Sequence, residues 1–448
     1  MQEIGIQLRA KKSTLFTLGV LGLIFYCPSW NSYFVSDDYH FLGRIDFSQS
    51  VQYFAKSWGY GNEYRPLLPF SYSLDATISD ESPIGFHVTN TVLHLAIAVL
   101  AGLSAYAFGL SASVSILSAV LFFLNPVVHE SVLWISGRPV LLGALFVLLS
   151  IWTFARSRID SSKFWYVASM VSFVLALLSY EGASALPFLL AILLLPRSRI
   201  DFKVIRLIGP YFLLLIAYTI FWNVLFGGKI TRFTVESSLF GAVCSCYSML
   251  KHVFFGSTLG IPLAFYIFLL FLFLRTAKNR RTCMFLFVLM IASYLPFFIV
   301  HGFADRFAYL ASVPIAILLA SMILSVDYGK FRRLAVPILI VVLVGYYGYS
   351  MQKRIVTWKE AGEITREITS GIKRLRPNLP ADAVLHVLGV PEMYKNAYVF
   401  ITGLEPAIQH LYHCAGLHVS MNTFPSPEER GNVFVFQYTN RLVEEIVR

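Results

Sequence analysis

The sequence predicts a polytopic, all-α membrane protein with a small α/β domain at its C-terminal end. Of its 448 residues, 57% are hydrophobic and only 14% are charged, and the mean hydropathy is +0.66. A soluble globular domain carries roughly 25% charged residues. Apolar runs long enough to approach a membrane crossing recur from Ser13 to Ser350. This composition excludes a cytosolic enzyme, a disordered chain and a secreted disulfide scaffold.

The apolar runs predict eleven membrane-spanning helices. They cover residues 13–30, 86–109, 112–124, 139–155, 164–180, 182–195, 207–226, 253–274, 282–300, 307–326 and 334–350. The stretch 164–196 would be about 50 Å long as a single helix, well above the roughly 30 Å of a bilayer core. We therefore expect two short helices there, joined by a tight turn at Tyr180-Glu181-Gly182.

The net charge of +11 follows from membrane topology. If the N-terminus is cytoplasmic, Lys and Arg cluster in the cytoplasmic loops, as the positive-inside rule requires. The basic charge therefore does not indicate nucleic-acid binding. We expect a multi-pass protein of the cell inner membrane, with a cytoplasmic N-terminus and a periplasmic, exoplasmic C-terminal domain.

After residue 350 the hydropathic pattern changes to that of an exoplasmic α/β domain. We expect an amphipathic helix at 352–375, a helix at 405–412 and strands at 383–390, 398–401 and 432–438. The predicted domains are thus residues 1–350, a transmembrane domain whose first exoplasmic loop is 31–85, and residues 351–448.

Two adjacent carboxylates, Asp37 and Asp38, directly follow the first predicted span. Partial burial and a neighbouring like charge raise the pKa of such a group, which allows it to serve as a general base. The alternative is a hydrated loop pair. Other polar clusters fall on the same side of the membrane, where ionisable residues are functional candidates, and this favours the base.

Three arginines, Arg65, Arg138 and Arg306, lie at predicted exoplasmic membrane edges. A guanidinium group can bind phosphate through two parallel hydrogen bonds. Long cationic side chains also anchor helices at the interface by reaching toward water. We interpret these arginines together as candidate phosphate ligands.

His87, Asn90 and His94 share one face of the second predicted span. Binding of a substrate and hydrogen bonding between helices both remain open for them. No histidine pair in the predicted membrane region has an H-x-x-x-H or H-E-x-x-H spacing, and no nucleotide-binding motif is present. We therefore expect no cofactor, and no metal site is indicated.

Several segments together resemble the GT-C glycosyltransferases. The most similar branch is that of the transmembrane-and-TPR O-mannosyltransferases and their bacterial relatives; lipid-A aminoarabinose transferases and protein O-mannosyltransferases are similar more loosely. The segments are Asp37-Asp38, YRPL at 64–67, FHVTN at 86–90 with His94, NPVVHE through WISGR at 125–138, ADRFAYL at 304–310, and the pair Arg354 and Trp358. The chain has Tyr180 and Phe307 where that branch has Lys and Tyr, and an α/β domain replaces the TPR array.

This resemblance implies an inverting glycosyltransferase. It would move a single sugar of hexosyl or mannosyl type from a polyprenyl-phosphate carrier to a hydroxyl of a glycan, lipid or protein acceptor on the exoplasmic face. Asp37 would be the base, supported by Asp38, and the three arginines would bind the donor phosphate. Supporting roles would fall to His87, Asn90, His94, His129, Glu130, Glu181, His301 and Asp305. Asp305 would orient Arg306, and Glu181 would hold an arginine or a sugar hydroxyl.

Two other functions remain as alternatives. A flippase or transporter of lipid-linked sugars would need polar residues at the membrane midplane and often has two similar halves. The predicted spans show neither feature. A non-catalytic membrane scaffold would not need converging polar loops on one face. The glycosyltransferase is therefore the favoured hypothesis.

Overall fold

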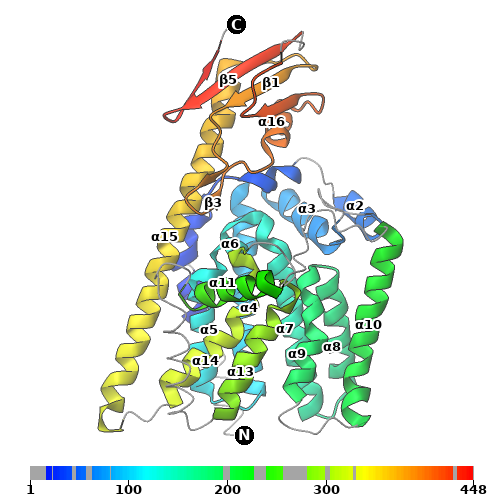
Figure 1. The fold of residues 1–448 in the computed structure, drawn as a ribbon, viewed down its shortest axis with the longest axis vertical. Coiled ribbons are helices and arrows are strands. Elements are labelled where there is room, and N and C mark those ends of the chain that lie inside the picture. Colours follow the sequence, from blue (N-terminus) through cyan, green and yellow to red (C-terminus); the bar gives the residue numbers. More distant parts are fainter. Residues whose placement is uncertain are drawn as a thin grey trace.

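The computed structural model describes residues 17–22, 24–42, 47–56, 63–80, 82–194, 202–226, 239–255, 280–297, 303–325, 329–426 and 431–446. Helices pack side by side in a bundle, and a small sheet lies beyond one end of it (Figure 1). The longer helices are α3 (Leu67–Ser79), α4 (Pro83–Ala107), α5 (Ala112–Leu124), α7 (Arg138–Ile159), α8 (Lys163–Leu177), α9 (Leu186–Leu194), α10 (Phe202–Phe226), α11 (Leu239–Phe255), α13 (Arg280–Ser293), α14 (Ser312–Ser325), α15 (Arg332–Leu375) and α16 (Leu404–Tyr412).

Short helical turns connect these helices and carry most of the polar motifs. They are η1 (Cys27–Ser29), η2 (Ser36–His40), α2 (Phe47–Ser50), η3 (Val51–Phe54), η4 (Pro126–Val128), α6 (His129–Leu133), η5 (Ile135–Gly137), η6 (Glu181–Ala185), η7 (Leu295–Phe297), η8 (Asp305–Ala308) and η9 (Gly329–Phe331). Most of the polar motifs therefore lie on short turns between apolar helices, whereas His87, Asn90 and His94 lie within α4.

Four helices in the described part are long and apolar enough to cross a membrane. They are Pro83–Ala107, Ile135–Ile159, Val204–Leu225 and Arg332–Leu375, and the bent pair Ala112–Leu124 and Pro126–Leu133 brings the number to five. The chain is thus a multi-pass membrane protein. Eleven full spans are not found in the described ranges, because apolar helices such as Lys163–Leu177 and Ser312–Leu324 are shorter than the roughly 20 residues of a full crossing.

The tight turn predicted near Glu181 is confirmed. Helix α8 ends at Leu177, η6 turns the chain, and α9 begins at Leu186. Two predictions cannot be compared with the structure: His301 and most of the predicted span 253–274 lie outside the described residues.

Helix α15 joins the bundle to the C-terminal sheet. The sequence predicted two elements, a span at 334–350 and a helix at 352–375, but α15 is continuous over 44 residues. No proline or glycine lies between Ser350 and Ala361 to interrupt it. Its length of about 66 Å exceeds the bilayer thickness, so it extends beyond the bundle along one side of the molecule (Figure 1). The domain boundary at residue 350 remains a prediction.

The C-terminal sheet has the strand order β4-β1-β5-β6. Its strands are β1 (Val384–Leu388), β4 (His418–Met421), β5 (Val433–Thr439) and β6 (Leu442–Glu445); β2 (Met393–Tyr394) and β3 (Ala397–Tyr398) form a separate hairpin. β1 is parallel to β4 and β5, whereas β6 is antiparallel to β5. The predicted α/β character is confirmed, although β4 and β6 were missed because only short stretches there alternate in hydropathy.

Candidate active site

The Asp37-Asp38 turn lies in η2, which contacts the C-terminal region through the Ser36 N–H and the Val399 carbonyl. Asp38 is 1% exposed and accepts hydrogen bonds from the backbone N–H of Val35 at 3.0 Å, the N–H of Ser136 at 2.9 Å and the hydroxyl of Ser136 at 2.6 Å. Burial raises the pKa of Asp38 to about 7, although these hydrogen bonds favour the charged form. Through its three hydrogen bonds, Asp38 fixes the conformation of the turn and joins it to Ser136.

Asp37 has a different environment on the same turn. Its side chain is half-buried, and one carboxylate oxygen accepts a hydrogen bond from the exposed hydroxyl of Thr402. Asp37 thus remains reachable from solvent, whereas Asp38 is enclosed. Of the two carboxylates, Asp37 is therefore the candidate for a general base.

Arg306 lies opposite Glu130, which is buried in α6. The guanidinium of Arg306 pairs with Glu130, and its backbone N–H donates to the same carboxylate at 3.0 Å. The phenol of Tyr398 donates to Glu130 at 2.7 Å and accepts from Arg306 at 2.9 Å. Burial opposes the charge of Arg306, but Glu130, Tyr398 and Tyr180 together outweigh it and hold the pKa of Arg306 above its usual value. The side chain of Arg306 is 25% exposed, so it can meet a ligand.

An apolar cavity opens beside Arg306. Apart from the open solvent at its mouth, it has a free volume of about 20 Å³, the room of roughly one water molecule. Its lining residues are Val140, Gly143, Ala144, Val147, Tyr180, Gly182, Ala183, Phe297, Arg306, Phe307 and Leu310. Arg306 is the charged residue among them. An anionic group at the mouth could contact Arg306, with the beginning of an apolar part lying against the lining.

A second polar cluster fixes the loop before Arg306. The indole N–H of Trp358 donates to His129 Nδ1 at 3.0 Å, so the imidazole proton lies on Nε2, which donates to Asp305 at 2.8 Å. His252 contacts the other Asp305 oxygen at 2.5 Å. Burial opposes ionisation of Asp305, but the two histidines outweigh it and hold its pKa well below the usual range. Asp305 was expected to orient Arg306; its carboxylate contacts the two histidines, and the carboxylate that pairs with Arg306 is Glu130.

Arg65 is held by two carboxylates near η6. Its Nε and Nη2 donate to Glu181 at 2.9 and 2.5 Å, and its Nη1 contacts Glu63 at 2.7 Å. The prediction that Glu181 would hold an arginine agrees with this geometry. Arg65 is 8% exposed and stacks over Tyr180, a residue of the cavity wall. Arg65 therefore packs against Tyr180 and helps to hold that wall residue in place.

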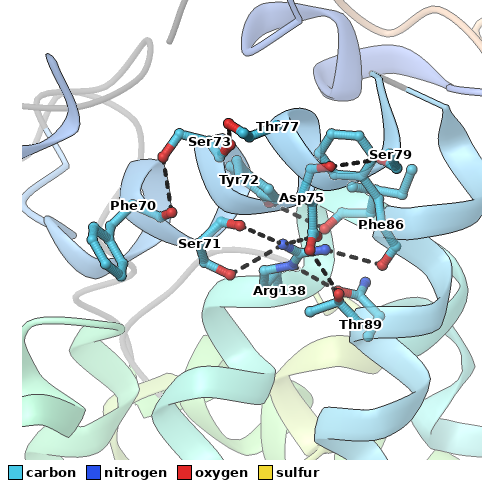
Figure 2. Close-up of polar contacts among 12 residues, drawn as sticks. Phe70, Ser71, Tyr72, Ser73, Asp75, Thr77, Ser79, Phe86, Thr89 and Arg138 are labelled. Atoms are coloured by element: carbon cyan, nitrogen blue, oxygen red, sulfur yellow. Dashed lines mark hydrogen bonds and ion pairs between the residues drawn. The ribbon is translucent and has the colours of Figure 1, made fainter. Parts of the chain in front are cut away.

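The geometry opposes the phosphate-binding role predicted for Arg138. Its side chain is fully buried and forms an ion pair of 2.5 Å with Asp75. Its remaining donors bond Asn90 Oδ1 at 2.8 Å, Ser71 Oγ at 3.1 Å and the carbonyl of Phe86 at 3.0 Å. Figure 2 shows the guanidinium enclosed by Ser71 and Asp75 of α3 and by Phe86 of α4. Arg138 fastens α3 and α4 to the start of α7.

The three residues of α4 that the sequence singled out form hydrogen bonds between segments. His87 Nε2 donates to the carbonyl of Ser32 at 3.1 Å, and Asn90 donates to the carbonyl of Trp134 at 3.2 Å. His94 bonds Tyr309 at 2.7 Å and the carbonyl of Phe123 at 3.1 Å. All three are at most 2% exposed. Of the two functions left open, the structure favours hydrogen bonding between helices.

The sequence reasoning missed four participants in this region: Asp75, His252, Tyr398 and Thr402. Tyr398 and Thr402 come from the C-terminal region and have no local pattern that sets them apart. Asp75 faces Arg138 only because α3 folds over α4 and α7. Among the described residues, no group of three or more His, Cys, Asp or Glu side chains could hold a metal ion.

Comparisons with known proteins give a consistent but partial result. No family model matches the chain. The human protein O-mannosyl-transferase TMTC4 is 34% identical over 139 residues, which are 26% of this chain and 19% of that protein. Human TMTC3 is 28% identical over 114 residues, which are 25% of this chain and 12% of that protein. The match therefore spans less than a fifth of either relative.

Solved structures cover far more of the chain. ArnT from Cupriavidus metallidurans bound to undecaprenyl phosphate aligns with a TM-score of 0.57 at 11% identity, over 90% of this chain and 85% of ArnT. The apo form of ArnT aligns with a TM-score of 0.55 at 12% identity, over 92% and 86% of the two chains. The chain thus has the fold of ArnT, and its resemblance to the GT-C glycosyltransferases and the O-mannosyltransferase branch is confirmed.

Proposed function

We propose that this protein is a membrane glycosyltransferase that moves one sugar from a polyprenyl-phosphate carrier to an acceptor hydroxyl. The observation that carries the proposal is the apolar cavity with Arg306 at its wall. Arg306 lies over the ring of Trp134, two residues before the Ser136 that donates to the Asp37-Asp38 turn. The fold shared with ArnT, which has been solved with undecaprenyl phosphate, supports a polyprenyl-phosphate donor. The similarity to O-mannosyl-transferases supports a hexosyl sugar.

In this mechanism, Asp37 removes the proton of the acceptor hydroxyl as the oxygen attacks the anomeric carbon. A bond forms between that oxygen and the carbon, and the bond from the carbon to the phosphate oxygen breaks. The electron pair leaves with polyprenyl phosphate. A single displacement of this kind inverts the anomeric configuration.

Arg306 meets the negative charge that grows on the leaving phosphate. Preorganised cations act strongly when water is largely excluded, because the surrounding dielectric constant is low. Glu130 and Tyr398 fix the guanidinium at the cavity, and the apolar wall accepts the start of the lipid chain. Arg65 acts indirectly, since it braces Tyr180. No metal is needed, because an arginine can neutralise a single phosphate.

The proposal includes the orientation of the protein in the membrane. With the N-terminus in the cytoplasm, η2, the cavity and the C-terminal domain lie on the exoplasmic face of an inner membrane. The basic loops between the spans support this orientation. A lipid-linked donor presented on that face would explain the absence of nucleotide-binding motifs from the sequence.

The experiment that tests this function measures donor consumption. Purified protein in proteoliposomes is offered a panel of polyprenyl-phosphate sugars with cell-envelope extract as acceptor, and released polyprenyl phosphate is counted by mass spectrometry. We expect release from one donor, reduced about 100- to 10,000-fold in Asp37→Asn. Absence of release from every donor would contradict the proposal and favour a transporter or a scaffold.

A further inference from the structure

The C-terminal segment 399–403 is fastened to the turn that carries Asp37. The backbone N–H of Ser36 donates to the carbonyl of Val399 at 2.7 Å, and the N–H of Thr402 donates to Ser36 Oγ at 3.4 Å. Gly403 has φ +87°, and a Cβ atom there would lie 2.0 Å from the carbonyl oxygen of Ser36. Only glycine allows this approach. The backbone of the segment is therefore held in place without the side chain of Thr402.

The hydroxyl of Thr402 occupies a particular position on this turn. It donates its proton to Asp37 and lies 3.3 Å from His40 Nε2, from which it accepts a hydrogen bond. Both Asp37 and Thr402 have solvent-accessible surface. An alcohol that donates to a carboxylate is also the arrangement that an acceptor needs before a general base removes its proton.

We propose that segment 399–403, together with His40 and Asp37, forms the acceptor subsite, and that the Thr402 hydroxyl stands in for the acceptor hydroxyl. The inference rests on the function proposed above and extends it to the C-terminal domain. The ligand class is an alcohol, from a sugar, a lipid or a Ser or Thr side chain. An acceptor takes over the hydrogen bond to Asp37, and the Thr402 side chain moves to another staggered rotamer.

Thr402 therefore competes with acceptors for the base. Removing its hydroxyl frees Asp37 and strengthens binding of a small alcohol, while the donor site at Arg306 is unaffected. A hydrogen bond between an alcohol and a carboxylate is strong enough to change an apparent affinity by about three- to ten-fold.

The test uses the full-length protein in proteoliposomes with its sugar donor and glycerol as a generic alcohol probe. Release of polyprenyl phosphate is measured against glycerol concentration for wild type, Thr402→Ala, Thr402→Ser and Thr423→Ala. Thr423 is an exposed threonine of the same domain and serves as the matched control. We expect the KM for glycerol to fall about three- to ten-fold in Thr402→Ala alone, with the donor KM unchanged.

Several results would overturn the inference. One is an unchanged glycerol KM in Thr402→Ala; another is an equal loss of kcat in both Thr402 variants, which would indicate a structural role. A sugar-sized mass increase on wild type that is absent from Thr402→Ala would make Thr402 itself the acceptor. If Asp37-dependent release persists in these cases, only the acceptor subsite is refuted. If wild type releases nothing from any donor, the proposed function fails and the subsite with it.

Discussion

Tyr398 in the C-terminal hairpin donates a hydrogen bond of 2.7 Å to Glu130, 268 residues earlier in the chain. The same phenol accepts from Arg306 at 2.9 Å, and its ring packs edge-on against Trp134 and Trp358. The C-terminal region therefore completes the surroundings of the arginine at the cavity. The C-terminal region contributes two residues to the candidate site: Tyr398, which contacts Arg306, and Thr402, which contacts Asp37.

Tyr398→Phe should weaken the donor site and leave the fold intact. The variant keeps the aromatic packing but removes the hydroxyl that forms hydrogen bonds with both Glu130 and Arg306. We expect kcat/KM for the donor to fall by about ten-fold, the value of one hydrogen bond to a charged group. Tyr438→Phe is the control, because Tyr438 also donates to a carboxylate, Glu367, that pairs with an arginine far from the cavity. Equal losses in the two variants would contradict the assignment.

Arg306→Gln should reduce donor consumption more strongly. Removal of a preorganised donor to a developing negative charge lowers kcat by about 100- to 1,000-fold in other enzymes. The measurement is the steady-state release of polyprenyl phosphate by protein whose thermal stability has been checked. Arg306→Lys should recover part of the rate, since it keeps the charge but loses the planar guanidinium.

Arg306→Gln also leaves Glu130 without its cationic partner, and this effect needs its own control. In the double variant Arg306→Gln, Glu130→Gln, the uncompensated carboxylate is absent. Stability should recover in this variant, whereas the rate of release should stay low. Recovery of the rate would show that the defect came from the stranded carboxylate.

Asp38 should make thermal stability depend on pH. Burial raises its folded-state pKa to about 7, above the usual value of a free carboxyl group. The folded protein therefore binds the proton more tightly than the unfolded chain, so the contribution is largest at low pH and is lost as pH rises through 7. The Tm of wild type should fall between pH 5 and 8 by more than that of Asp38→Asn. Equal pH dependence in detergent-solubilised wild type and variant would refute this.

Arg138→Gln should destabilise the protein without altering the donor site. It leaves the buried Asp75 without its cationic partner, with only the Thr89 hydroxyl still donating to it, and removing one partner of a buried ion pair typically costs about 3 to 5 kcal/mol. The control is Arg156→Gln, which breaks a partly exposed pair with Asp160 worth less than about 1 kcal/mol. Thermal unfolding measures both effects. A drop in Tm of equal size in the two variants would contradict the structural role of Arg138. A changed donor KM in folded Arg138→Gln would support the phosphate-binding role predicted from the sequence.

Much of the architecture could be predicted from local sequence. The turn near Glu181 followed from helix length alone, and β1, β5 and α16 followed from hydropathic periodicity. The continuity of α15 could not be predicted in this way. The change from an apolar to an amphipathic pattern at residue 350 resembles a domain boundary, but the helical backbone continues through it.

The sequence by itself determined that this is a multi-pass membrane protein and where its polar motifs lie, because hydropathy and motif spacing are local properties of the chain. Only the tertiary structure decided what each motif does. Arg138 and Arg306 both lie at predicted membrane edges. Arg138 is buried in an ion pair with Asp75, whereas Arg306 lines an apolar cavity. Burial and partnership depend on segments far apart in the chain, and no local pattern encodes which of them will meet.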